Sequence, residues 1–572
     1  MATSGQSAVP IPALTSSKQL PDGFQRSCAQ WMNYPRNVQR RTAGMSPSTL
    51  AAYHDELKTI DSDLFVSSEN EVEVCFRDFG AEGKAQGEVS KLKAHSEKKM
   101  WAWLGIEKAL DPNNPKEETL VMSKLDPKSR FIYIYGSSSR HRLQITRSML
   151  AMILSFHQVM PEYLDFIMLF GNQVTARDMR FSGFRRQEAL KKPPPSLVLG
   201  DLGRSGQQFE LVYNLKGVTK VDSDEWRIRN AAFYHRYDIV TGRTLWIVTK
   251  GGLDIYQRYQ ELTSPHGRPE DMAFGTPEEC FASSLSPHVL FFRWSSEDWR
   301  GYIRWLEESV EKESGMAMLG PWEKGNSPRH YQPSDIRRMQ VWEELASEAI
   351  VVLEGNLEVI SSLQGVYRGL AQDKRFPHRK ACAGEITDFI NQLDAMKSEL
   401  RNIIGRCHAL VKVSADRKEL IKLYREDDAA ARMHRLNKNM EEDTIMVRIV
   451  TLVTLVYLPA TFVSTFFSTD IIKYQEDNYP DGKYSKMAME RWLQVTVPLT
   501  VLTLLAAWAG NKWTSRSSDE PQGVAAGSIS TIIPSWLRER RRAATSTAAE
   551  LLPLSNPGAH GKSVSSGIDK WN

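Results

Sequence analysis

Cysteine is scarce in this sequence, and the few cysteines lie far apart. Five occur among 572 residues, and no two have the Cys-x-x-Cys spacing of a zinc or redox site. The odd number does not favour a disulfide framework. We therefore expect free thiols in a reducing compartment at Cys28, Cys75, Cys280, Cys382 and Cys407.

The N-terminal segment lacks a long apolar run. Residues 1–25 are rich in Ser, Pro and Ala, and Lys18 is their only basic residue. Neither a secretory signal nor an Arg-rich transit peptide fits this composition. We expect residues 1–47 to be disordered and any membrane insertion to use internal segments.

A large excess of one charge sign is absent, and so are catalytic motifs. Lysine and arginine number 73 against 69 acidic residues, and the net charge of +4 does not predict nucleic-acid binding. The chain has no HExxH, GxSxG or Walker A motif, so we do not expect an enzyme. His157 and His235 stand beside apolar or aromatic residues and are interpreted as structural.

Gly200, Gly203 and Gly206 predict a surface turn.

Two long uncharged runs lie near the C-terminus. Ile449 to Phe467 and Trp492 to Gly510 contain no charged residue, and each can cross a hydrocarbon core of roughly 30 Å at about 1.5 Å per residue. Trp492, Trp508 and Trp513 stand at the ends of the second run, where aromatic rings favour the interface. We predict a two-helix transmembrane domain over residues 446–510, with an outer loop over 471–491, in the plasma membrane or an internal membrane.

Basic residues outside the two runs suggest their orientation. Lys438 and Arg448 flank the first run, and Lys512 and Arg516 follow the second. Because cytoplasmic flanks are enriched in Lys and Arg, we expect both termini in the cytoplasm. Residues 511–572 then form a disordered, basic cytoplasmic tail.

The region from 48 to 320 predicts a cytoplasmic α+β or α/β domain. Alternation over Glu71–Phe76 indicates a half-buried strand. Met149 to Phe170 predicts a helix interrupted before Pro161. Further strands are expected at Phe131–Tyr135, Phe209–Tyr213 and Thr244–Val248.

Residues 333–445 predict a stalk of long helices. A helix start at Pro333–Asp335 precedes apolar residues at helical spacing up to Tyr367. The segment Lys374–His378 breaks the pattern, and a coiled-coil-like stripe runs from Ile386 to Leu410. Two long helices joined by a short break should pack antiparallel.

A polar stripe marks the first apolar run. Five threonines fall within an arc of about 100° at about 100° per residue. Two interpretations are open. The hydroxyls bond to their own helix and pack against a neighbour, or they line a pore in which Val447 and Leu458 form apolar constrictions. A pore would require an oligomer. The threonines are Thr444, Thr451, Thr454, Thr461 and Thr465.

This layout resembles the CorA-type magnesium channel family, and more narrowly its fungal branch. Leu458–Ser464 is similar to the family's first span, and His157–Pro161 and Ala231–His235 also resemble the fungal branch. The resemblance implies a homopentamer in the lipid bilayer that transports a divalent cation such as Mg²⁺ and needs no cofactor. With the stripe, it implies these pore-lining residues: Thr444, Val447, Val450, Thr454, Leu458, Thr461 and Thr465.

The family's Gly-Met-Asn signature is missing. Counted from Pro459 without a gap, it falls on Ser468, Thr469 and Asp470, which we expect at the pore mouth. Asp470 would give a metal-binding ring of five carboxylates; alternatively it caps a helix end or pairs with Lys473. The missing signature also leaves open a membrane-anchored interaction or sensing protein that has lost transport.

Overall fold

A computed structural model describes most of the chain and divides it into two compact units, Met1–Ala431 and Arg432–Asn572. Each unit is described by itself. The described residues are 20–40, 44–81, 88–111, 114–122, 124–138, 140–172, 180–222, 225–264, 266–319, 331–468 and 486–517.

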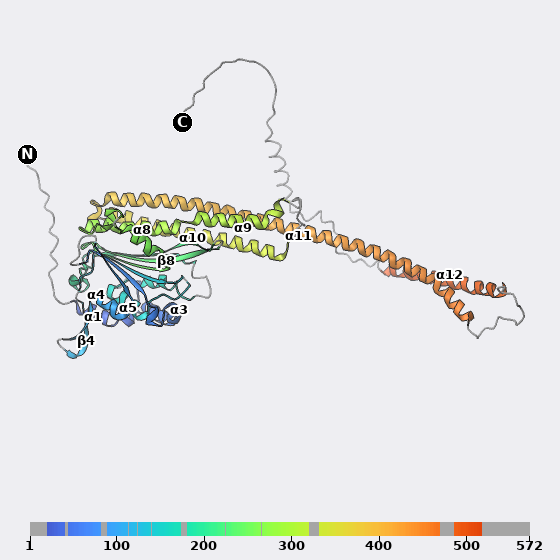
Figure 1. The fold of residues 1–572 in the computed structure, drawn as a ribbon, viewed down its shortest axis with the longest axis horizontal. Helices are drawn as coiled ribbons and strands as arrows, with labels where there is room; N and C mark the ends of the chain where they lie inside the picture. Colours follow the sequence, from blue (N-terminus) through green and yellow to red (C-terminus); the bar gives the residue numbers. More distant parts are fainter. Residues whose placement is uncertain are drawn as a thin grey trace, which may run out of the picture. The chain divides into compact units, whose positions relative to one another are not determined.

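A seven-stranded sheet forms the centre of the first unit (Figure 1), with the order β2-β1-β5-β9-β8-β7-β6. Neighbouring strands are antiparallel except β5 and β9, which are parallel. Strands β3 and β4 form a separate two-stranded ribbon. The strands are β1 Val74–Phe79, β2 Val89–Ala94, β3 Ile106–Asp111, β4 Asn114–Met122, β5 Ser129–Gly136, β6 Phe184–Ala189, β7 Gln208–Asp222, β8 Glu225–Asp238 and β9 Thr244–Gly251.

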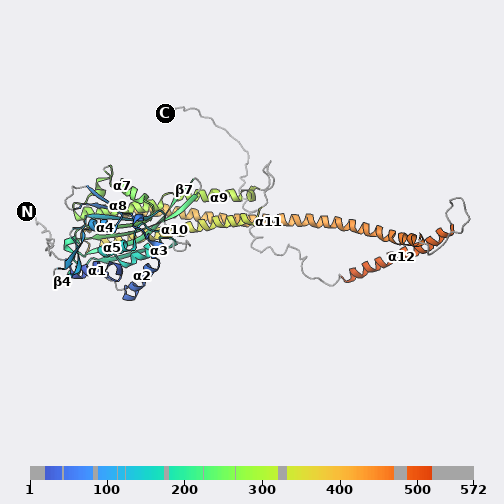
Figure 2. The same ribbon diagram turned by 60° about the horizontal axis from the view of Figure 1, so that its bottom comes forward.

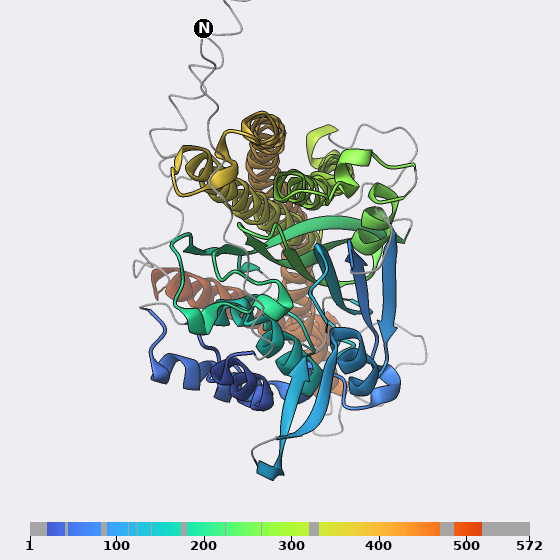
Figure 3. The same ribbon diagram turned by 90° about the vertical axis from the view of Figure 1, so that its left-hand side faces the viewer.

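Helices cover both faces of the sheet, as Figure 3 shows. Along β5, Phe131 and Tyr133 belong to one hydrophobic core and Ile132 and Ile134 to the other, because alternate side chains point to opposite faces. The first core includes α7 Asp254–Leu262, α8 Pro277–Ser296, α9 Trp299–Leu319, α10 Pro333–Gln372 and the start of α11 Ala383–Ser468. The second includes α1 Asp22–Ala29, α2 Pro47–Thr59, α3 Asp61–Leu64, α4 Glu97–Leu104, α5 Arg147–His157 and α6 Leu164–Ile167.

Several predicted elements are confirmed, and two are corrected. The strands predicted at 131–135, 209–213 and 244–248 lie within β5, β7 and β9, and α5 ends before Pro161 as expected. The half-buried strand predicted over Glu71–Phe76 begins later, at Val74, and is wrong in its burial, since all six residues of β1 are buried, including Arg77 and Asp78. The segment 226–237, which had no predicted structure, forms most of β8. The burial of β1 follows from a sheet that is covered on two faces, and β8 forms because it pairs with β7 and β9.

The predicted disordered N-terminus extends too far along the chain. Helix α1 and the turn after it pack into the second core, where Phe24, Cys28 and Tyr34 are buried. The Tyr34 hydroxyl donates to the carbonyl of Val159 at 3.0 Å. Residues 1–19 lie outside the described part of the chain. The five cysteines are all described, and they are buried free thiols.

Helices α10 and α11 pack antiparallel, as predicted. Lys397 Nζ donates to Gln364 Oε1 at 2.9 Å, and further along α11 Lys418 Nζ donates to Gln340 Oε1 at 2.7 Å, so the pairing runs in opposite directions. The predicted boundary at residue 333 is not a domain boundary, because the first unit continues to Ala431. The physical reason is that α10 and the start of α11 bury their apolar sides in the same core as the sheet.

The second unit contains the end of α11 and α12 Lys486–Ser517, which meets α11 near the C-terminal end of α11 and diverges from it (Figures 1 and 2). The predicted outer loop 471–491 ends too late, because residues 486–491 already belong to α12, and the first residues of the predicted tail are also helical. Residues 518–572 lie outside the described part.

Three described helices are long and apolar enough to cross a membrane: Pro333–Gln372, Ala383–Phe466 and Met489–Gly510. The most apolar window of the first is 56% buried inside the chain, whereas those of the other two are 6% buried. Burial therefore separates α10, a core helix of the first unit, from the two helices that the sequence predicts as spans.

Candidate pore-lining helix

The threonine hydroxyls of α11 donate to backbone carbonyls of their own helix. Thr451 donates to Val447 at 2.6 Å and Thr465 to Thr461 at 2.6 Å. Thr461 donates to Tyr457 and Leu458, each at 3.0 Å. Thr444 and Thr454 bond back in the same way. The hydroxyl hydrogen is therefore used within the helix, and the oxygen lone pairs face outward.

Helix α12 packs against one side of α11. Val463 is 3% exposed and Pro459 is also buried, whereas most other described residues of α11 in this unit are exposed. Trp492 Nε1 of α12 donates to the Ser464 hydroxyl at 3.1 Å. On α12, Thr496 is 5% exposed. These contacts identify the side of α11 that its own chain covers.

The threonine stripe lies on a different side of α11. At about 100° per residue, its centre is about 130° from the midpoint of Pro459 and Val463. Val447 and Leu458, which fall within the arc of the stripe, are 64% and 70% exposed, and Val450, about 20° outside the arc, is 60% exposed. Packing against α12 therefore does not account for the stripe. Asp443, also exposed, falls within the same arc at the N-terminal end.

The predicted site residues are brought together in part. The seven predicted pore-lining residues are all described and share this uncovered side. Ser468 is the last residue of α11, while Thr469 and Asp470 lie outside the described residues. Their roles stay predictions. Within the described ranges, no group of three or more His, Cys, Asp or Glu side chains could hold a metal ion.

His235 lies in the first core beside a second histidine. His288 Nδ1 is 2.7 Å from the Tyr213 hydroxyl, and His288 Nε2 is 3.0 Å from the Tyr367 hydroxyl and 3.2 Å from His235 Nδ1. Burial lowers the pKa of His235 to about 3 and that of His288 well below its usual value, so both rings are neutral. The chain of contacts joins the sheet to α8 and α10, which agrees with a structural role.

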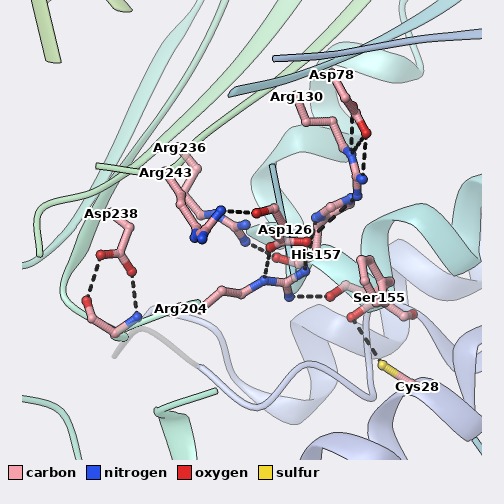
Figure 4. Close-up of polar contacts among 12 residues, drawn as sticks. Cys28, Asp78, Asp126, Arg130, Ser155, His157, Arg204, Arg236, Asp238 and Arg243 are labelled. Carbon is pink, nitrogen blue, oxygen red and sulfur yellow. Dashed lines mark hydrogen bonds and ion pairs between the residues drawn. The ribbon is translucent and has the colours of Figure 1, made fainter. Parts of the chain in front are cut away.

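His157 has a different environment, which the sequence did not predict (Figure 4). Arg204 donates from Nε to Asp126 Oδ2 at 2.6 Å and from Nη2 to His157 Nδ1 at 3.3 Å. Arg130 holds Asp78 in a two-bond ion pair, with Nη2 2.8 Å from Oδ2 and Nε 3.0 Å from Oδ1.

The backbone around His157 also receives arginine side chains. Arg204 Nη1 donates to the Phe156 carbonyl at 2.6 Å, and Arg236 donates to the carbonyl of His157 itself. Arg243 donates to the carbonyl of Asp126. We call Arg130, His157, Arg204, Arg236 and Arg243 with Asp126 the arginine cluster.

Charges within the arginine cluster determine its protonation. Burial raises the pKa of Asp126, but the neighbouring Arg204 and Arg130 outweigh burial and lower it well below its usual value. Burial, reinforced by Arg204, lowers the pKa of His157, so its ring is neutral. The carboxylate is thus charged and the imidazole is not.

The glycine-rich turn supplies Arg204 and is not on the surface. Gly203 and Gly206 have φ of 72° and 74°, which glycine adopts most readily. Arg204 and Ser205 between them are buried, and so is Leu202 before them. The turn prediction is confirmed and its surface location is wrong. A charged residue flanked by two glycines, so close to a predicted strand, was the signal that could have indicated a buried role.

Comparison with known proteins identifies the family. No curated protein sequence matches the chain. Among solved structures, full-length CmaX is 12% identical, covering 78% of this chain and 99% of its own, with a TM-score of 0.29. The CorA magnesium transporter from Methanocaldococcus jannaschii is 9% identical, covering 76% and 97%, with a TM-score of 0.26. At these scores the family assignment depends on sequence.

A family model described as CorA-like transporters matches residues 26–318, more than half of the chain. The matched range begins within α1 and ends within α9, so it includes the whole sheet and the arginine cluster. This family consists of integral membrane transporters and not of enzymes. The chain therefore belongs to the CorA-like transporters.

Proposed function

We propose that several copies of the chain form a pathway for a divalent metal cation, with Mg²⁺ as the first candidate. The C-terminal end of α11 lines this pathway. The observation that carries this proposal is the threonine stripe, which faces away from α12 with its hydroxyl hydrogens bonded inward. A polar stripe that the described residues leave uncovered needs water or another chain beside it in a membrane.

The chemistry of the stripe suits a hydrated cation. Each back-bonded threonine offers a neutral oxygen acceptor. Mg²⁺ gives up water reluctantly, and neutral acceptors can hold its hydration shell without stripping it. Val447, Val450 and Leu458 lie among the hydroxyls. In an oligomer each would form an apolar constriction, where the pore can close by dewetting.

Acidic residues stand at both ends of the proposed path. Asp443 lies in the arc of the stripe at its N-terminal end, and Asp470 follows the end of α11, outside the described residues. In a pentamer each would give five carboxylates, which concentrate cations near the openings. We propose Asp470 as a metal ligand at the outer mouth and both termini as cytoplasmic.

One or two spans per chain cannot enclose an aqueous path, so transport requires several chains. The CorA resemblance leads us to propose five. Native mass spectrometry of the detergent-purified protein should give a pentamer. A monomer at every protein-to-detergent ratio would contradict the channel.

The direct test is ion flux through the purified protein in liposomes, compared among Mg²⁺, Ni²⁺, Co²⁺ and Na⁺. We expect flux of divalent cations above that of Na⁺. The absence of Gly-Met-Asn at Ser468–Asp470 favours a second candidate, a membrane-anchored interaction or sensing protein. That candidate gives a folded oligomer without flux of any of the four ions.

A further inference from the structure

Two small adjoining cavities lie at the arginine cluster. The first, of about 10 Å³, is lined by His157, Asp126 and Asp238 with Arg130, Arg204, Arg236 and Arg243. The second, of about 40 Å³, is lined by Arg40, Arg204 and Arg236, without a carboxylate. Because Arg204 and Arg236 line both, the two cavities share a wall. Five arginines and two aspartates therefore surround a space that the protein leaves empty.

The nearby carboxylates are already occupied. Asp126 binds Arg204, and Asp78 binds Arg130. Asp238 accepts from the Ser205 hydroxyl at 2.8 Å and from backbone N–H groups. Glu210, the cross-strand neighbour of Arg236, accepts instead from Tyr234 at 2.7 Å and Gln208 at 2.6 Å.

Two guanidinium groups at these cavities have no ionic partner. Among the described residues, Arg40 and Arg236 form no ion pair; Arg40 Nη2 donates to the carbonyl of Gly206 at 2.5 Å, and Arg236 donates to a carbonyl. Arg236 is 6% exposed, and a buried guanidinium charge without a carboxylate is costly. Arg40 is partly buried and adds a second unpaired positive charge beside it, so the two residues favour a bound anion.

A buried donor without an acceptor lies beside them. Because a guanidinium can only donate, His157 Nδ1 must accept from Arg204, and the ring proton is therefore on Nε2. His157 is 1% exposed, and its Nε2 has no partner within the described residues. Arg40 Nη1 is likewise buried and unpartnered. These groups all offer hydrogens and none offers a lone pair, so the missing partner is an acceptor.

We propose that these cavities bind a small oxyanion, of the phosphate class, between Arg40, Arg204 and Arg236. A water-sized atom needs about 10–15 Å³ of such space, so the larger cavity has room for about three atoms of that size and the smaller for one. Arginine matches phosphate oxygens with paired N–H groups, and partly exposed Gln39, Arg40 and Leu197 give the second cavity access to solvent. The proposal does not rest on transport.

The test is calorimetric titration of the full-length protein in detergent with sodium phosphate at constant ionic strength. We expect saturable binding that chloride does not reproduce. Arg40→Gln and Arg236→Gln should each weaken it about tenfold, the effect of losing one charge-assisted contact. Arg36→Gln removes an exposed arginine paired with Asp55 and should leave the affinity unchanged.

A competition experiment identifies the source of the anion, and a second variant keeps the test decisive if the first variant does not fold. Competition by ATP without Mg²⁺ would assign the site to the terminal phosphate of a metabolite, and its absence to free phosphate. If Arg236→Gln does not fold, Arg40→Gln decides, because Arg40 is only partly buried. Equal binding of phosphate and chloride, no saturable binding, or unchanged affinity in Arg40→Gln would overturn the proposal and leave a cavity that holds water.

Discussion

The Thr461 hydroxyl belongs to the uncovered stripe and donates to two carbonyls of its own helix. Thr461→Leu should reduce cation flux about tenfold or more, because it replaces an oxygen acceptor by a larger apolar group that narrows and dries the path. Flux into liposomes measures the effect. Thr503→Leu makes the same chemical change in α12, where Thr503 also bonds back to its own helix, and should leave flux near the parent value.

Asp443 tests the electrostatic part of the proposed path. Asp443→Asn should lower Mg²⁺ flux several-fold at low ionic strength, and the loss should shrink as salt screens the remaining charges. Glu441→Gln is the matched control, because Glu441 lies about 160° from Asp443 around the helix. Equal losses in both variants, or a loss independent of salt, would show that Asp443 does not face the path.

At the scale of single residues, the sequence predicted the helical spacing of the threonines. It did not predict which side of α11 another helix covers. The threonine stripe follows from helical spacing alone. Which side α12 covers depends on Trp492 meeting Ser464, a contact between segments that no local pattern encodes. The arginine cluster was missed for the same reason, since Arg236 meets the backbone of His157 only after the sheet and α5 have packed.

Between elements, Lys216 links β7 to the segment before β6 and, through its backbone, to α10. Its Nζ donates to the Phe181 carbonyl at 2.6 Å and the Ser182 hydroxyl at 2.8 Å, and its main chain pairs with the Asn356 side chain. Burial lowers the pKa of Lys216 to about 7, although Glu348 partly opposes this shift.

Lys216→Met should make stability less dependent on pH. Between about pH 7 and the usual lysine pKa of about 10.4, the unfolded chain binds a proton that the folded chain does not, so the parent gains stability as pH rises. The variant lacks this gain, and its advantage over the parent should be largest below pH 7 and decrease towards pH 10. Thermal unfolding followed by tryptophan fluorescence measures it, with exposed Lys220→Met as control. Parallel pH profiles of parent and Lys216→Met would contradict the assignment.

Elements were predicted best where their apolar pattern is simple. Phe131–Tyr135 and Thr244–Val248 are short apolar runs, and both are central strands. β8 was missed because Arg227, Arg229 and Arg236 interrupt its pattern, and pairing with β7 and β9 overrides that signal. The half-buried reading of β1 failed because nothing local shows that a second helical layer covers the other face.

At the scale of the whole molecule, burial distinguishes the apolar helices that we expect to cross the membrane from α10. We expect α11 and α12 to span and α10 to stay outside the membrane with the first unit, because α10 shares the core of the sheet. A cysteine at Val351, which is 48% exposed on α10, should react only with reagent on the side of the N-terminus. Tyr479→Cys should react only from outside. The five native cysteines are buried, so their background labelling should be low. Labelling of Val351→Cys from outside would contradict the topology in which only α11 and α12 span the membrane.

The strand order has a consequence for synthesis of the chain. β9 is the last strand in sequence, yet it lies between β5 and β8 and hydrogen-bonds to both. Until residue 251 has left the ribosome, β2-β1-β5 and β8-β7-β6 are separate sheets, each with an unpaired edge. The β5 edge is strongly apolar. The nascent chain therefore exposes an unpaired, aggregation-prone strand while more than a hundred further residues are translated. Chaperone demand should therefore peak before Thr244 emerges and fall once β9 closes the sheet.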